Sequence, residues 1–240
     1  MTMPHEIVFL LDVDNTLLDN DRVIEDLRDH LESEFGAASG ARYWAIFEAL
    51  RDELGYADYL GALQRYRLEA MNDPRFLLMS SFLMDYPFAS RLYEGALDAI
   101  GHLSRWGPTV ILSDGDVVFQ PRKIQRSGVW EAVEGRVLIY IHKELEIDEV
   151  ERRYPARHYV MVDDKLRILA AMKKAQAESL TTVFVRQGHY ALDPTVVRAY
   201  PPPNLALERI GNLLDCDLPV LRDGARKTGF TQPCDDAGPS

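Results

Sequence analysis

Hydrophobic positions divide this chain into three stretches with different periods. Residues 7–11 form an apolar run bounded by polar residues, which predicts a strand buried on both faces inside a parallel sheet. Residues 20–84 repeat apolar positions at intervals of three and four, which predicts amphipathic helices. From residue 93 onward, helical and apolar segments alternate, which is typical of βαβ units. The pattern therefore predicts a parallel α/β sheet interrupted once by a helical insert.

Turn residues set the expected limits of these elements. Four short helices are expected within the insert, with ends at Gly36 and Gly55 and a fourth start at Asp73-Pro74, and they should form a bundle. In the rest of the chain we expect helices at 95–105, 117–127, 144–153, 165–177 and 205–214 and strands at 109–112, 136–141, 158–162 and 181–185. With residues 7–11 this makes a five-stranded, Rossmann-like parallel sheet flanked by helices.

The domain organisation follows from the same pattern and from composition. We expect residues 1–19 and 85–216 to form an α/β core and residues 20–84 to form a small all-helical, four-helix domain. Beyond residue 217 the chain turns to Pro, Gly, Asp and Ser, so residues 217–240 are expected to be a poorly ordered tail.

Charge and targeting signals narrow the function classes. The 240 residues carry a formal net charge of −11 with a pI near 5.0, which argues against nucleic-acid binding because that needs clustered Lys and Arg. No apolar run approaches 18 residues, and the N-terminus lacks a basic segment followed by an apolar one, so we expect no membrane partner and a cytoplasmic location. Cys216 and Cys234 have no metal-ligand spacing, which favours thiols in a reducing compartment.

Polar residues gather where the predicted strands end, and the carboxyl ends of parallel strands meet at one edge of a sheet. Two carboxylates only two residues apart follow the first strand and would repel each other unless a cation or a cationic side chain lies between them. The remaining strand ends supply a hydroxyl, an ammonium group and further carboxylates. In order along the chain these residues are Asp12, Asp14 and Thr16, then Ser113 and Asp114, then Lys143, then Asp163 and Asp164.

This set, in this order, resembles the haloacid dehalogenase (HAD) superfamily of hydrolases over roughly residues 5–190. The family pattern is a strand ending in D-x-D-x-T, a strand ending in Ser or Thr, a Lys, and a strand ending in an acidic pair. Lys143 also lies at a spacing from Ser113 and Asp163 that suits the family. The insert at 20–84 is similar to the family's helical cap domain.

The resemblance implies a role for each matched residue. Asp12 would be the nucleophile that forms an aspartyl-phosphate, and Asp14 would be the general acid and base. Mg²⁺ would be the cofactor, and Ser113 and Lys143 would bind the phosphoryl group and offset its charge. In full, the implied metal ligands are Asp12, Asp14 (through its carbonyl), Asp163 and Asp164, and the implied phosphate-binding residues are Thr16, Ser113, Asp114 and Lys143.

Two positions depart from the family pattern without removing a reacting group. Asn15 replaces the commoner Gly, which is acceptable because Asn tolerates unusual backbone angles, and Glu144 follows the Lys where many relatives have Pro. Asp14 matters more, because the carbon-attacking dehalogenases of the superfamily lack an acid there. The prediction is therefore a Mg²⁺-dependent phosphatase acting on a small phosphorylated molecule. Two alternatives stay open: a metal-independent dehalogenase-type hydrolase that attacks carbon, and a non-catalytic binding protein with the same fold.

Several residues also have ordinary structural interpretations. The acidic pair after the fourth strand is suited to cap the next helix, and His142 is expected on the opposite side of its strand from Lys143. The aromatic stripe around Trp44 is expected in the bundle core, and the helical arginines Arg42, Arg65 and Arg67 at its surface. Gln187-Gly188-His189 follows the fifth strand at the same edge and could line the pocket.

Overall fold

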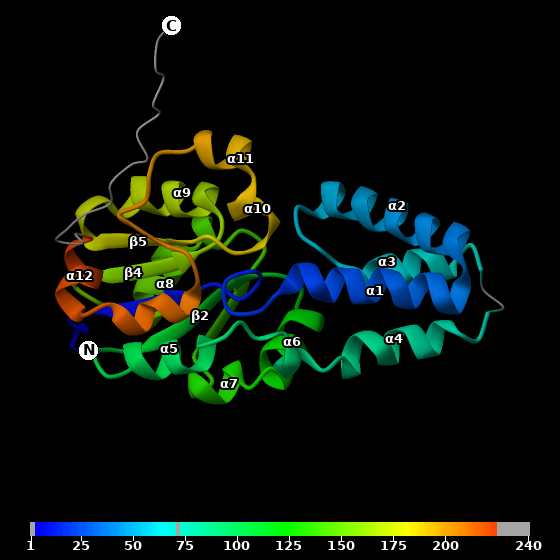
Figure 1. Ribbon diagram of the computed structural model, residues 1–240, viewed down its shortest axis with the longest axis horizontal. Coiled ribbons are helices and arrows are strands. Elements are labelled where there is room, and N and C mark those ends of the chain that lie inside the picture. Colours follow the sequence, from blue (N-terminus) through cyan, green and yellow to red (C-terminus); the bar gives the residue numbers. More distant parts are fainter. Residues whose placement is uncertain (1–2, 71–72, 225–240) are drawn as a thin grey trace, which may run out of the picture.

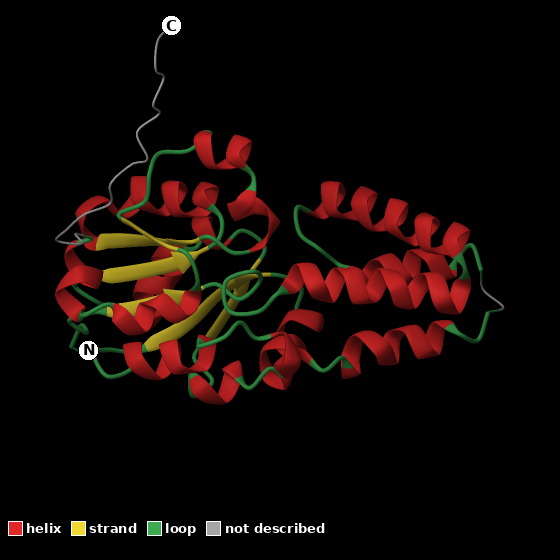
Figure 2. Cartoon of the chain, viewed as in Figure 1, coloured by secondary structure: helices red, strands yellow, loops and turns green. Residues whose placement is uncertain are grey.

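The computed structural model describes residues 3–70 and 73–224. A parallel sheet with the strand order β3-β2-β1-β4-β5-β6 lies at its centre, and Figure 2 shows helices on both sides of it. The six strands are Val8–Leu11 (β1), Thr109–Asp114 (β2), Val137–Tyr140 (β3), Tyr159–Asp163 (β4), Leu180–Val185 (β5) and Leu205–Leu207 (β6).

Helices cover both faces of the sheet because the buried strand β1 alternates its side chains between two hydrophobic layers. Phe9 and Leu11 belong to the layer that contains α5 and α6, whereas Val8 and Leu10 belong to the layer that contains α8 and α9. Figure 1 shows α5 and α7 on one side of the sheet and α9 on the other. The helices outside the insert are Ala96–Leu103 (α5), Phe119–Arg126 (α6), Val129–Ala132 (α7), Ile147–Arg153 (α8), Leu166–Gln176 (α9), Gly188–Leu192 (α10), Pro194–Arg198 (α11) and Leu218–Asp223 (α12), with 3₁₀ segments at Phe88–Arg91 (η1), Lys143–Leu145 (η2), Ala177–Ser179 (η3) and Ile210–Asp215 (η4).

The insert between β1 and β2 is helical, as predicted, and extends away from the sheet in Figure 1. Asp19 caps its first helix by accepting a hydrogen bond from the backbone N–H of Arg22, and Gly36 and Gly55 follow the first two helices with positive φ. Its core contains buried aliphatic and aromatic residues from several helices. The four helices are Asn20–Phe35 (α1), Ala37–Leu54 (α2), Tyr59–Arg67 (α3) and Phe76–Asp85 (α4). Their assignment to a separate domain stays a prediction.

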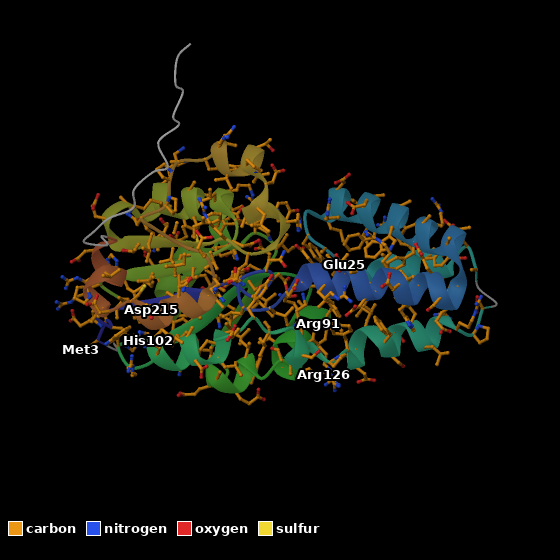
Figure 3. All side chains as sticks on the ribbon, in the orientation of Figure 1. Met3, Glu25, Arg91, His102, Arg126 and Asp215 are labelled. Atoms are coloured by element: carbon orange, nitrogen blue, oxygen red, sulfur yellow. The ribbon has the colours of Figure 1, made fainter. Side chains whose placement is uncertain are left out.

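Ion pairs and hydrogen bonds cross the junction between the insert and the rest of the chain. Arg91 pairs with Asp26 of α1 at 2.6 Å, and Arg126 of α6 donates to the carbonyl of Asp85 at 3.1 Å. Figure 3 shows both arginine side chains where the insert adjoins the sheet layers. The insert is thus anchored to α6 and η1.

Two predictions about the C-terminal part of the chain are wrong. The sheet has six strands and not five, because residues 205–207, predicted as the start of a helix, pair with β5 in register. The side chain of Asn204 holds this short edge strand against β5. Its amide oxygen accepts hydrogen bonds from the backbone N–H and the hydroxyl of Thr182. Residues 210–215 form η4, so no α-helix spans 205–214.

The predicted poorly ordered tail also begins too early. Residues 218–223 form α12, whose first turn is capped by the side chain of Asp217 and whose Leu221 is buried. Residues 225–240, including Cys234, lie outside the described residues. Cys216 is buried in the core. Within the described residues, the helices are all too short or too polar to span a membrane.

Candidate active site

The sheet order brings the predicted reactive side chains to one edge. β1 lies between β2 and β4, so the residue after β1, Asp12, has Ser113 on one side and Asp163 on the other. Asp12, Ser113 and Asp163 are all buried. The convergence of strand ends predicted from the sequence is therefore confirmed.

Lys143 completes this convergence from β3, which is two strands away from β1. Its ammonium nitrogen lies 2.5 Å from Oδ1 of Asp12 and 2.7 Å from Oδ2 of Asp163, and its side chain is fully buried. Its backbone N–H donates to Oδ1 of Asp114 at 2.8 Å, which fixes the turn after β3. Burial alone would lower the pKa of Lys143, but Asp12 and Asp163 raise it above its ordinary value. Lys143 therefore stays charged between two carboxylates.

Three buried carboxylates form a cluster that could hold a metal ion. Asp12, Asp163 and Asp164 each offer an oxygen atom within 4.8 Å of the other two. Burial raises the pKa of Asp163 to about 6 and that of Asp164 well above its ordinary value. Among the described residues, neither carboxylate oxygen of Asp164 has a hydrogen-bond partner. Buried oxygens without donors fit a hard cation such as Mg²⁺, which prefers carboxylate ligands.

The loop after β1 holds Asp12 by short polar contacts. Thr16 donates its hydroxyl to Oδ2 of Asp12 at 3.2 Å and accepts the backbone N–H of Asp164 at 3.1 Å. Thr16 thus links two members of the carboxylate cluster, and its predicted contact with phosphate stays a prediction. Asn15 has a φ of 62°, as its place in the family pattern suggested, and its side-chain oxygen accepts the backbone N–H groups of Asn20 and Asp21 at the start of α1.

Asp14 lies apart from the carboxylate cluster and is partly exposed. Its two oxygens contact Lys123 at 2.6 Å and the amide of Gln120 at 3.3 Å. The cluster does not include its side chain, so only the predicted ligand role of its backbone carbonyl is left. Asp14 also lines a cavity beside the loop that follows β1.

This cavity, of about 510 Å³, lies between the sheet edge and the insert. On the core side it is lined by Asp114, by polar residues of α6 and by basic residues at the start of α9, whereas the insert contributes aromatic and basic residues. Burial raises the pKa of Asp114. The polar, charged and aromatic residues of the lining include Asp14, Asn20, Arg28, Trp44, Arg51, Tyr56, Asp114, Gln120, Lys123, Lys165, Arg167 and His189.

The residues that line the cavity differ in part from those expected from the sequence. Trp44 packs beside Tyr43 and Phe47 in the bundle, as expected, but it also faces the cavity. Arg42 and Arg65 form exposed ion pairs with glutamates, in line with the surface role expected for them. His189 lines the cavity, and its ring and backbone bind Asp21 of α1.

Sequence reasoning missed the polar residues of α6 and the lysine after the acidic pair. Gln120 and Lys123 are almost fully buried beside Asp14. Lys165 lines the cavity, and its pKa is raised by Asp164 and Asp12 against the effect of burial. One feature of the sequence could have indicated Lys123. Lys123 lies four residues after Phe119, so it shares the buried face of a helix that starts just after Ser113.

Comparisons with known proteins agree with this geometry. A scan against family models and a search of curated proteins find no match to this chain. Among solved structures, a protein from Burkholderia xenovorans LB400 described as a haloacid dehalogenase-like hydrolase is 71% identical, with a TM-score of 0.85; the match covers 89% of this chain and 100% of that one. This chain belongs to the HAD-like hydrolases.

More distant HAD-like structures share the fold at low identity. One is an L-2-haloacid dehalogenase from Xanthobacter autotrophicus with chloropropionic acid covalently bound, 16% identical with a TM-score of 0.58 over 89% of this chain and 98% of that one. Another is a HAD hydrolase from Bacillus subtilis bound to magnesium, 17% identical with a TM-score of 0.55 over 88% and 98%. These two similarities concern the fold alone.

Proposed function

We propose that this HAD-like hydrolase is a Mg²⁺-dependent phosphatase that cleaves a small phosphomonoester through an aspartyl-phosphate on Asp12. The observation that carries the proposal is the buried cluster of Asp12, Asp163 and Asp164, in which both oxygens of Asp164 lack a donor among the described residues. An uncompensated buried carboxylate is costly, and a divalent cation bound by oxygen would remove that cost.

The charge balance of the site supports the same conclusion. Asp12 and Asp163 pair with Lys143, and the charge of Asp164, together with that of Asp12 and Asp163, raises the pKa of Lys165. With all three carboxylates ionised, the two lysines leave the site net negative, and it would repel a phosphate dianion. A bound Mg²⁺ would offset this charge and orient a phosphoryl oxygen next to Asp12.

The chain's own residues can then perform both halves of the reaction. An oxygen of Asp12 attacks phosphorus while the bond from phosphorus to the leaving oxygen breaks, and Asp14 gives that oxygen a proton. Asp14 next takes a proton from water, whose oxygen attacks phosphorus. The bond between phosphorus and Asp12 breaks, inorganic phosphate leaves, and both aspartates return to their first state. Lys143 stabilises the charge that gathers on the phosphoryl oxygens.

The place of the insert beside the cavity supports the proposal that the substrate is a small molecule. The insert forms one wall of the cavity with Trp44, Tyr56 and Arg51, and a volume of about 510 Å³ is within the usual range for small-molecule sites. We propose that the insert, residues 20–84, acts as a cap that excludes water during phosphoryl transfer. No nucleic-acid or membrane partner is part of this proposal.

The competing function is dehalogenation, because solved structures with this fold include L-2-haloacid dehalogenases. A hydrolase that attacks carbon forms an ester on its aspartate and needs neither a metal nor an acid beside the nucleophile. Two features favour attack on phosphorus over attack on carbon. Asp14 lies on the cavity wall, and the cluster of Asp12, Asp163 and Asp164 could hold a cation. A non-catalytic binding role has no support from the site, in which every expected reacting group is present.

Purified protein tests the choice directly. Hydrolysis of an aryl phosphate is measured with Mg²⁺ and with EDTA, beside release of chloride from 2-chloropropionate. We expect Mg²⁺-dependent release of phosphate, no release of chloride, and a loss of at least about 10³-fold in kcat for Asp12→Asn. Asp98→Asn, at an exposed position on α5, is the matched control and should keep wild-type activity. Metal-independent release of chloride would establish the dehalogenase instead.

A further inference from the structure

We propose that Lys123 is a positioning residue that holds the Asp14 carboxylate and makes its orientation depend on the start of the helical insert. The proposal rests on the proposed function, because it concerns the carboxylate that acts as acid and base. Lys123 belongs to α6 and is not one of the strand-end residues on which the family resemblance was built.

Lys123 is buried between the loop after β1 and the first helix of the insert. Its side chain is only 1% exposed, and its ammonium nitrogen lies 2.6 Å from Oδ1 of Asp14 and 2.9 Å from the side-chain oxygen of Asn20. The ring of Phe119 lies 5.3 Å from the same nitrogen. A buried ammonium group must be paired, so these contacts define the position of Lys123 and of its partners.

Gln120 holds the other oxygen of Asp14. Its amide nitrogen donates to Oδ2 of Asp14 at 3.3 Å and to the hydroxyl of Ser113 at 2.9 Å. Each oxygen of Asp14 is therefore bound by a different side chain of α6, and one of these side chains also binds Ser113. This two-point contact restricts rotation of the carboxylate, which a proton transfer to a defined oxygen requires.

Asn20 connects the same contact to the insert. It is the first residue of α1, the helix that begins the insert. The insert also packs directly on α6, because the ring centroids of Tyr59 on α3 and Phe119 on α6 lie 5.2 Å apart. If the insert moves away from α6, Lys123 loses one of its two oxygen partners. The position of the insert is thereby linked to the position of the Asp14 carboxylate.

The test compares two substrates that differ in their need for an acid. Departure of 2,4-dinitrophenolate needs no proton, whereas departure of an alkoxide from an alkyl phosphate does. Because kcat/KM reports the steps up to departure of the leaving group, Lys123→Met should lower it for the alkyl phosphate by about 10- to 100-fold, a part of the usual contribution of a general acid. For 2,4-dinitrophenyl phosphate kcat/KM should change less than about threefold, while kcat falls because water attack still needs Asp14 as base.

The outcomes separate this inference from the proposed function. An equal loss of kcat/KM on both substrates, or no loss on either, would overturn the positioning role and leave the phosphatase intact. Failure of the wild-type protein to hydrolyse both phosphates with Mg²⁺ would overturn the phosphatase and the positioning role together. Lys174→Met, an exposed lysine of α9, controls for loss of a positive charge and should match wild type on both substrates.

Asn20→Ala tests the link to the insert and remains informative if Lys123→Met does not fold. It should show the same substrate-selective loss at a smaller size, because Lys123 keeps its contact with Asp14. The double variant should lose no more than Lys123→Met alone, since both changes act through one contact. Additive losses, or a loss for Asn20→Ala that does not depend on the leaving group, would contradict the link.

Discussion

Replacing Asp163 with Asn should remove a pH dependence from the stability of the metal-free protein. Burial raises the pKa of this carboxyl from 3.8 to about 6 in the folded state, and the charge of Asp12 adds to the effect while Lys143 opposes it. The folded state therefore binds a proton more tightly than the unfolded chain. The stability that this proton contributes is fully present below pH 3.8 and is lost as the pH rises through 6.

The size of the effect is set by these two pKa values. The whole difference corresponds to about 3 kcal/mol, at about 1.4 kcal/mol for each pH unit. Between about pH 5 and about pH 7.5 the expected loss is about 1–2 kcal/mol of unfolding free energy. For a chain of this length that equals about 2–8 °C in melting temperature. Asn keeps the shape of the side chain but does not titrate, so Asp163→Asn should flatten the profile by about this amount.

Thermal unfolding of EDTA-treated protein across about pH 5 to 7.5 measures this difference, with Asp98→Asn as a surface control that should keep the wild-type slope. Mg²⁺ extends the test. At about 100 times its Kd it should add about 2.7 kcal/mol at about pH 7.5, and less at about pH 5, where protons compete for the same oxygens. Equal pH slopes in wild type and Asp163→Asn, or a Mg²⁺ effect that is larger at the acidic end, would refute the reasoning.

Two further predictions concern the cavity wall and the loop beside it. Trp44→Ala should raise KM about tenfold with little change in kcat, because Trp44 lines the cavity from the insert and is none of the proposed reacting groups; steady-state kinetics would contradict this if kcat fell instead. Gly188→Ala should destabilise the fold by about 2–4 kcal/mol, since its φ is +71° and an added Cβ would lie 2.4 Å from the Cβ of Asn15. Chemical denaturation measures that loss, and an unchanged midpoint would show that the start of α10 can adjust.

The sequence was enough to predict where the central strands end and which side chains come directly after them. A continuous apolar run indicates a strand buried on both faces, and parallel strands bring their carboxyl ends to one edge whatever their order. For this reason Asp12, Ser113 and Asp163 could be grouped in advance. Lys143 joins them despite an intervening strand because its side chain is long enough to reach Asp12.

The contacts of Asp14 could not be predicted in the same way. They depend on how the buried face of α6 is oriented toward the loop after β1, which periodicity within α6 does not determine. β6 was missed for a different reason. Three residues are too few to show a period, and the strand depends on the hydrogen bonds between Asn204 and Thr182, which are 22 positions apart.

The two connections that enter and leave the insert lie side by side. Leu18 forms an antiparallel bridge with Leu92, the backbone N–H of Asp19 donates to the carbonyl of Arg91 at 2.8 Å, and that of Tyr93 donates to the carbonyl of Leu17 at 2.9 Å. The insert is therefore a loop closed at its base, and its length and sequence can change without moving the ends of β1 and β2. In protein engineering, Leu18 and Leu92 are the natural boundaries for exchanging the insert to alter substrate range, provided that the graft keeps Asn20 against Lys123.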